Sequence, residues 1–342
     1  MTEDRRPTLT TVAQRAQVSR QTVSNVLNTP EIVRPETRER VLRVIAELDY
    51  RPNVAARQLR TRRSSVLGLC VPPAADGISG QVLDRFLHAL TEEAQRGGLR
   101  IMLFTAPDDE AEIREYENLR ATTGVDGFVL ANTHPRDPRT AWLAAHGVPF
   151  VSFGRPWDRG ASSHPWVDID GREGTRAATR HLLDAGHRRI AFLGWPEGSG
   201  VGDDRLAGFL AALDAAGLGP GGVVERCEDG VPEGEAAARR ALVRDDVTAL
   251  VCVSDSVALG AMTAVREADL ADPARIVAIS GFDDTPVAAA VGLTSVAQPV
   301  EDVAARAVAL VRAQIHGDPV DTDRQVLIEP RLVVRATSPA RH

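Results

Sequence analysis

Lysine is absent from this 342-residue chain, and all forty of its basic residues are arginine. A nucleotide-binding P-loop needs a lysine beside the phosphates, and Schiff-base chemistry needs a lysine amine, so the sequence excludes both. Apolar runs long enough to span a membrane, about eighteen residues, are also lacking. The N-terminal stretch MTEDRRPTLT contains no apolar signal segment. We therefore expect a cytosolic protein without membrane contact.

Cysteines and catalytic motifs are equally scarce. Cys70, Cys227 and Cys252 each lie inside an apolar run, which predicts small buried side chains rather than a disulfide framework or a zinc site. The eight histidines form no HxxxH pair, and no Gly-x-Ser-x-Gly elbow is present. The glycine-rich stretch 198–203 ends in Asp203, where a dinucleotide fingerprint needs a small residue. We expect no enzyme activity, no metal and no cofactor.

The net charge of −7 is divided unevenly along the chain. Residues 1–63 contain thirteen arginines and seven acidic residues, so this segment is +6 and the remainder is −13. A basic head on an acidic body predicts one unit that meets a polyanion and one that does not. A solvated basic face is the alternative.

The first fifty residues have the pattern of a helix-turn-helix unit. Leu9, Val12, Ala13 and Ala16 have the spacing of one amphipathic helix. After the three-residue turn 17–19, Ser19 can cap a second helix that runs to Leu27. Its outer face carries polar side chains suited to the edges of bases in the major groove, namely Arg20, Gln21, Ser24 and Asn25. A third helix is predicted from Pro35 to about Asp49. A three-helix bundle without a nucleic-acid role remains the alternative.

The segment 51–63 is short and rich in arginine. Asn53 can cap a helix there, but the segment is too short to be helical alone. It can fold only against something else, such as DNA and a second copy of itself. Leu59 is its exposed apolar residue and suits a wedge in the minor groove.

These segments resemble the signature of the LacI/GalR family of transcriptional regulators. The resemblance rests on Thr10–Ala13, Val18–Asn28, Thr37–Arg38, Leu48–Asn53 and Ala56–Leu59. It implies that Arg20, Gln21 and Asn25 read base edges. It also implies that the backbone of a palindromic operator is contacted or ordered by Thr8, Ser19, Thr22, Ser24, Asn28, Thr37 and Asn53. Ala56 and Leu59 would occupy the minor groove.

Two positions depart from the family pattern. Gln17 stands in the turn where the family usually has glycine, so a left-handed backbone there would cost on the order of 1 kcal/mol. Arg34 stands where the family usually caps the third helix with serine, a loss of about 1 kcal/mol. Neither change removes a DNA contact, and together they predict a headpiece of marginal stability.

From Ser64 onward, short apolar runs alternate with helical stretches, which predicts an α/β fold of doubly wound parallel sheets. About 275 residues suffice for two such sheets with a ligand between them. The region resembles the two-lobed, periplasmic-binding-protein-like core of the family at Val167–Asp170, Gly186–Ala191, Arg205–Phe209, Ser254–Gly260, Gly281–Asp284 and Leu293–Pro299.

The predicted domains are a headpiece at 1–50, a hinge helix at 51–63 and an effector-binding and dimerisation domain at 64–342. The loop Gly154–Pro165, rich in Gly, Pro and Ser, is taken as the first boundary between the lobes. We expect the chain to cross near 160–165, 290–296 and 322–328. The N-lobe would then contain 64–162 and 296–324, and the C-lobe 163–292 and 325–342.

The resemblance also predicts the effector site. Arg205 and Asp283 match the main polar ligand contacts of the family, and Gln298 lies at a lobe crossing. Ser254 replaces the usual Asn or Asp of sugar-binding members, and Gly154 replaces an acidic residue of a lactose-sensing member. Both changes are expected to enlarge the pocket.

Aromatic side chains are expected to supply stacking surfaces in place of the lost polar groups. Trp157 is assigned to the site, and Trp166 and Trp195 are further candidates, with ordinary packing as the alternative for each. A larger, aromatic-lined pocket favours a sugar as effector, and among sugars a disaccharide or another oligosaccharide rather than a simple hexose.

We therefore predict a homodimeric repressor that binds double-stranded DNA and is released by a small sugar. The chain stops eight residues past Val334, without the C-terminal heptad helix of tetrameric members, which favours a dimer. A regulator that uses a purine or other metabolite as corepressor is one alternative. A sugar-binding module that does not bind DNA and an enzyme on a doubly wound scaffold are the others.

Overall fold

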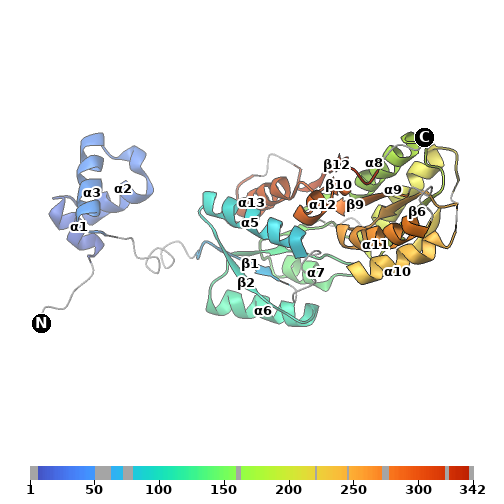
Figure 1. Ribbon diagram of the computed structural model, residues 1–342. Helices are drawn as coiled ribbons and strands as arrows, with labels where there is room; N and C mark the ends of the chain where they lie inside the picture. Colours follow the sequence, from blue (N-terminus) through green and yellow to red (C-terminus); the bar gives the residue numbers. More distant parts are fainter. Residues whose placement is uncertain are drawn as a thin grey trace, which may run out of the picture. The chain divides into compact units, whose positions relative to one another are not determined.

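The computed structural model describes residues 7–50, 63–71, 80–158, 163–219, 222–244, 246–271, 277–319 and 323–338. The chain divides into two compact units, Met1–Ser64 and Ser65–His342, each of which is described by itself (Figure 1). The predicted hinge contacts Asn53, Ala56 and Leu59 lie outside the described residues.

The first unit is a bundle of short helices. These are α1 (Leu9–Arg15), α2 (Arg20–Asn28), the 3-10 helix η1 (Pro30–Ile32) and α3 (Pro35–Glu47). Val12, Val23 and Val41, one from each α-helix, are fully buried at its centre. The predicted cap of α2 is confirmed, because the Ser19 hydroxyl accepts a hydrogen bond from the Thr22 amide at 3.0 Å.

Both departures from the family pattern have their expected structural effect. Gln17 has a φ of +53°, in the left-handed region that glycine adopts more readily. Arg34 precedes α3 without a side-chain hydrogen bond to the helix, although Pro35 supplies a suitable first residue. The turn is tied to α3 by Arg40, whose Nε donates to the Ala16 carbonyl at 3.1 Å.

The second unit begins with a parallel sheet in the order β11-β5-β4-β3-β1-β2. Its strands are β1 (Val66–Cys70), β2 (Arg100–Phe104), β3 (Gly127–Leu130), β4 (Phe150–Phe153), β5 (Trp166–Ile169) and β11 (Gln325–Ile328). Its helices are α5 (Gly80–Arg96), α6 (Asp109–Thr122), α7 (Pro138–Ala145) and α13 (Val300–His316). Alternate residues of one strand enter opposite cores: Val129 of β3 packs with α5 and α13, and Phe128 packs with α6 and α7. Helices therefore cover both faces, as in a doubly wound sheet.

A second sheet follows, in the order β12-β10-β9-β8-β6-β7, parallel except where β12 runs antiparallel to β10. Its strands are β6 (Ile190–Gly194), β7 (Val223–Arg226), β8 (Ala249–Cys252), β9 (Ala278–Asp283), β10 (Thr294–Ala297) and β12 (Arg331–Val333). Its helices are α8 (Gly171–Asp184), α9 (Gly200–Ala215), α10 (Val231–Leu242), α11 (Asp255–Ala271) and α12 (Pro286–Ala290). Glycines allow two helix pairs to pack closely, because a Cβ on Gly208 would clash with the Arg172 backbone and one on Gly260 with the Val231 carbonyl.

The chain passes between the two sheets at three points, each later than predicted. It crosses after β5, after β10 and after β11, near residues 170, 298 and 329, instead of near 160–165, 290–296 and 322–328. The predicted lobe boundaries are therefore wrong by several residues. The loop Gly154–Pro165 joins β4 and β5, which pair in the same sheet, so its Gly, Pro and Ser content marks a connection inside one lobe. Lobe 1 hereafter means 65–169 with 299–328, and lobe 2 means 171–298 with 329–338.

The three cysteines are free; Cys252 is buried as expected, whereas Cys70 and Cys227 are only half-buried. Burial raises the pKa of the Cys70 thiol to about 12 and that of Cys227 to about 11, so neither is a thiolate at neutral pH. None of the helices in the described part of the chain combines the length and apolar character of a membrane span.

The strained turn of the headpiece generates a first prediction. Substitution of Gln17→Gly should raise the stability of the headpiece by roughly 1 kcal/mol, because glycine accepts the left-handed backbone without a Cβ clash. Gln14→Gly, inside α1, should lower it by about the same amount. Hydrogen exchange of the α1 and α2 amides in the full chain measures both. Equal exchange in the Gln17→Gly variant and the wild type would show that the turn carries no strain.

Candidate functional site

A cleft of about 220 Å³ lies in the second unit, between the lobes and at the carboxyl ends of strands from both sheets. This is where doubly wound sheets bind ligands. Lobe 1 supplies Val82, Leu83, Ala131, Asn132, Thr133, Phe153, Gly154, Arg155, Trp157, Asp168 and Ile169. Lobe 2 supplies Gly171, Trp195, Val201, Asp204, Arg205, Asp229, Asp283 and Gln298. The predicted residues Gly154, Trp157, Arg205, Asp283 and Gln298 are therefore brought together.

Arg205 is a buried cation in this cleft, with 5% of its surface exposed. Its guanidinium lies 3.6 Å from the centre of the Phe282 ring and donates through Nη1 to the Val253 carbonyl. Burial lowers the pKa of Arg205, and the nearby Asp283 opposes that shift. Its Nε is buried without a hydrogen-bond partner. Because an unsatisfied buried donor is costly, this atom is suited to a ligand oxygen.

Asp283 lies at the end of β9, with its Oδ1 3.9 Å from Arg205 Nη1. Gln298, at the second crossing, donates to the same oxygen through Nε2. The backbone φ of Asp283 is +118° and that of Asp284 is +51°, conformations that side-chain-bearing residues rarely adopt. Such strain gathers at ligand sites, where it aims a side chain that regular backbone would not.

The carboxyl of Asp283 is shifted toward its neutral form. Burial raises the pKa of Asp283 to about 8, although Arg205 acts in the opposite direction. Its buried neighbour Asp255, which accepts from Ser295 Oγ and the Thr285 amide, has a pKa raised to about 6 by burial. Near neutral pH, Asp283 can therefore present an acidic hydrogen as well as an acceptor to a ligand.

The two small residues expected to enlarge the pocket do not enlarge it. Gly154 has a φ of +115°, and a Cβ there would clash with the Thr133 hydroxyl, so Thr133 fills the space. Ser254 does not line the cleft; its hydroxyl donates to Asp229, which does. Trp195 donates to the same Asp229 oxygen at 3.1 Å. Asp229 is thus a missed cleft residue, signalled only by its place shortly after a β-strand.

Three further polar cleft residues were also missed. Arg155 Nε donates to Asp168 at 2.8 Å, and its Nη2 donates to Asp204 at 2.7 Å. Asp168 belongs to β5 of lobe 1 and Asp204 to α9 of lobe 2, so this arginine joins the lobes. Burial raises the pKa of both carboxyls, and Arg155 opposes the shift in each. Trp166, the remaining tryptophan candidate, begins β5 and is not among the residues that line the cleft.

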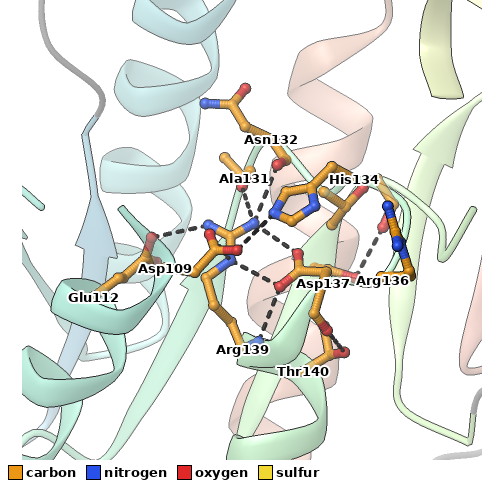
Figure 2. Close-up of polar contacts among 12 residues, drawn as sticks. Asp109, Glu112, Ala131, Asn132, His134, Arg136, Asp137, Arg139 and Thr140 are labelled. Carbon is orange, nitrogen blue, oxygen red and sulfur yellow. Dashed lines mark hydrogen bonds and ion pairs between the residues drawn. The ribbon is translucent and has the colours of Figure 1, made fainter. Parts of the chain in front are cut away.

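The wall formed by Asn132 and Thr133 is held from behind by a buried arginine. Arg139 of α7 donates to the carbonyls of Ala131 and Asn132 at 3.4 and 3.1 Å. It also pairs with Asp137 at 2.7 Å and Glu112 at 2.9 Å (Figure 2). Asp109, His134 and Asp137 lie close enough to hold a metal ion, but Arg139 Nε is 3.5 Å from Asp109 and already supplies a cation. The cluster therefore shapes the loop 131–137.

Several of the headpiece residues predicted to meet DNA lie on the surface of their unit. Arg20 and Gln21 are exposed, and Ser24, Asn25 and Thr37 are partly exposed. Gln21 Nε2 donates to the Asn25 side chain at 2.9 Å, so these two amides lie side by side on one face of α2. Thr8 and Ser19 are helix caps, and Thr22 shares the Ser19 cap. Asn28 ends α2.

A helix-turn-helix unit joined to a two-lobed domain with a polar cleft defines a ligand-responsive transcriptional regulator. Residues 8–53 match the lacI family of bacterial regulatory proteins, and residues 179–338 match the periplasmic binding protein-like domain. The chain is 37% identical to the HTH-type transcriptional regulator CelR of Thermobifida fusca, over 98% of this chain and 99% of that protein. It therefore belongs to the lacI family of transcriptional regulators, which are not enzymes.

Solved structures agree over the full length. A CelR–cellobiose complex is similar with a TM-score of 0.72 and 33% identity, covering 97% of this chain and 100% of that one. The lac repressor dimer bound to operator and the anti-inducer ONPF is similar with a TM-score of 0.77 and 28% identity, covering 98% and 99%. The predicted fold class, two parallel-sheet lobes behind a helix-turn-helix headpiece, is confirmed.

The raised pKa of Asp283 generates a second prediction. Between its ordinary pKa, near 4, and about 8, the folded protein holds a proton that the unfolded chain releases. Stability should therefore fall as pH rises from 6 to 8, by on the order of 1 kcal/mol per pH unit. Asp255 contributes mainly below pH 6. The Asp283→Asn variant should have a flatter profile of melting temperature against pH, and parallel profiles would contradict this assignment.

Proposed function

We propose that this protein is a homodimeric repressor that binds a palindromic operator and is released by a neutral sugar, with a β-linked glucose disaccharide as the leading candidate. The observation that carries the proposal is end-to-end similarity to CelR, a relative solved with cellobiose, combined with the polar cleft of this chain. As a regulator of DNA, it would act in the cytoplasm.

The DNA half of the proposal rests on the face of α2. Arginine and paired amide side chains on a capped, solvent-facing helix are the groups that read guanine and adenine in the major groove. The +6 charge of residues 1–63 favours phosphate contact, whereas the −13 charge of the remainder disfavours it. Two copies of the headpiece in a dimer would meet two half-sites, which accounts for a palindrome.

The sugar half rests on the charges of the cleft. Its described lining contains four carboxyls, Asp168, Asp204, Asp229 and Asp283, and two guanidinium groups, Arg155 and Arg205. This excess of carboxyls disfavours phosphorylated or carboxylated effectors and suits hydroxyl groups, which both donate and accept. Arg205 Nε and Trp157 Nε1 are buried donors without partners, so two hydroxyl oxygens of a sugar could satisfy them.

We favour release by the sugar over corepression because the lining suits a neutral, hydroxyl-rich ligand such as a sugar. A ligand can release DNA only to the extent that it prefers the released conformation. Closure of the lobes around the sugar would supply that preference by moving lobe 1, from which the chain leads to the headpiece.

Fluorescence anisotropy on an operator duplex from the upstream region of the gene tests the proposal. Cellobiose should release the wild-type protein. Arg205→Lys keeps the charge but loses the forked donor, so release should need at least about tenfold more sugar, while operator affinity without sugar stays the same. Arg176→Lys, at a partly exposed position of α8 that does not line the cleft, is the matched control. Failure of every neutral sugar to release the wild-type protein would refute the effector assignment.

The base-reading assignment is tested in the same assay. Arg20→Ala should weaken specific operator binding by roughly 5- to 150-fold, as expected for loss of one bidentate base contact. Arg43→Ala removes the same charge from the exposed side of α3 and should have a smaller effect that does not depend on operator sequence. Equal losses for the two variants would mean that Arg20 contributes charge only.

A further inference from the structure

Two residues of lobe 1 that follow β4 contact one face of a lobe 2 helix. Arg155 reaches Asp204, and Trp157 lies against Gly200; both partners belong to the start of α9. Residues four apart on a helix lie on the same face, so the two contacts form a single docking surface. We propose that the segment Arg155–Trp157, hereafter the strap, holds the lobes closed by docking on α9, and that Gly200 is the positioning residue that makes the docking possible. The inference rests on the ligand-driven closure proposed above.

Arg155 is the polar half of the strap. It is fixed within its own lobe by Asp168 at 2.8 Å and crosses to Asp204 at 2.7 Å. The side chains of Arg155, Asp168 and Asp204 are 21%, 10% and 16% exposed, so solvent screens these pairs less than it screens surface pairs. Asp204 also accepts from the Arg172 amide at 3.0 Å, which holds its carboxylate in place. Because Arg155 is already ordered by Asp168, little further side-chain order is lost when it meets Asp204.

Trp157 is the apolar half. A Cβ on Gly200 would overlap the five-membered ring of the Trp157 indole. The φ of Gly200 is not positive, so its backbone conformation does not require glycine. Glycine is required because the Trp157 ring occupies the space that a side chain would fill. The guanidinium of Arg155 lies 4.8 Å from the indole centre, so the two strap residues also support each other.

This packing changes the role expected for Trp157. The sequence suggests a stacking surface for a sugar, but Gly200 and Arg155 already cover part of the indole ring. Trp157 lines the cleft, and its Nε1–H is a buried donor without a partner. A sugar that accepts from this donor binds the docked strap, and therefore the closed lobes, more tightly than the open ones.

The test compares Gly200→Ala with Gly80→Ala in the full-length protein. Both glycines begin a helix, and a Cβ on Gly80 meets no atom within 4 Å. Operator affinity without sugar should be unchanged in both variants. The cellobiose concentration needed for release should rise about tenfold or more in Gly200→Ala, in the range of ordinary coupling energies, and not at all in Gly80→Ala. Release of Gly200→Ala at the wild-type concentration would overturn the proposal.

A double-substitution cycle separates docking from a local defect in α9. Trp157→Ala removes the ring that a Cβ on residue 200 would strike, so Gly200→Ala should have little additional effect on release in that background. Additive effects would show that Gly200 acts on its own helix and would contradict docking.

A readout without sugar keeps the strap distinguishable from the choice of effector. Hydrogen–deuterium exchange of the amides at 200–204 should be faster in Gly200→Ala than in the wild type and Gly80→Ala, because the strap no longer covers them. If cellobiose fails to release even the wild-type protein from the operator, the effector assignment fails. The exchange rates alone then decide whether the strap docks on α9. Faster exchange then supports the strap, and unchanged exchange rejects it.

Discussion

The buried guanidinium of Arg205 is the constraint around which the cleft is built. A cation with 5% exposure needs partners, and its three partners come from two strands: the Val253 carbonyl follows β8, and the Phe282 ring and the Asp283 carboxyl belong to the end of β9. Satisfying Arg205 therefore fixes the carboxyl ends of two neighbouring strands against the first turns of α9. Gln298 extends the arrangement to the second lobe crossing through its bond to Asp283. Arg205 lines a cleft that also contains hydroxyl-binding groups, and its Nε remains a buried donor without a partner.

The lobe closure proposed above depends on the contacts that join the lobes at this cleft. Each lobe has its own apolar core, so neither needs the other to fold. Two of these contacts are the hydrogen bond from Arg155 to Asp204 and the packing of Trp157 on Gly200, which depends on a missing Cβ. Such contacts can be made and broken without exposing the apolar core of either lobe. A ligand that accepts hydrogen bonds from the unpaired donors can therefore shift the equilibrium toward the closed lobes.

Sequence patterns predicted the architecture well, because hydrophobic periodicity and helix caps are local. The turn at Gln17, the Ser19 cap and the alternation of strands and helices could be anticipated from neighbouring residues. The lobe crossings could not, because a loop inside one sheet has the same Gly, Pro and Ser content as a crossing. The site was predicted in part: Arg205, Asp283 and Gln298 carry family motifs, whereas Asp229, Asp204 and Arg155 become cleft residues only through strand order and helix packing. Likewise, nothing local to Gly154 indicates that Thr133 fills its side-chain space.

We propose that the cleft and the headpiece share one conformational equilibrium. Titration calorimetry with cellobiose, on the free dimer and on the dimer saturated with operator, measures this coupling most directly. We expect weaker sugar binding in the presence of operator, by the same factor by which saturating sugar weakens operator binding, since linkage is reciprocal. Equal sugar affinity in the two states, in a protein that binds both ligands, would show that the cleft does not control the headpiece.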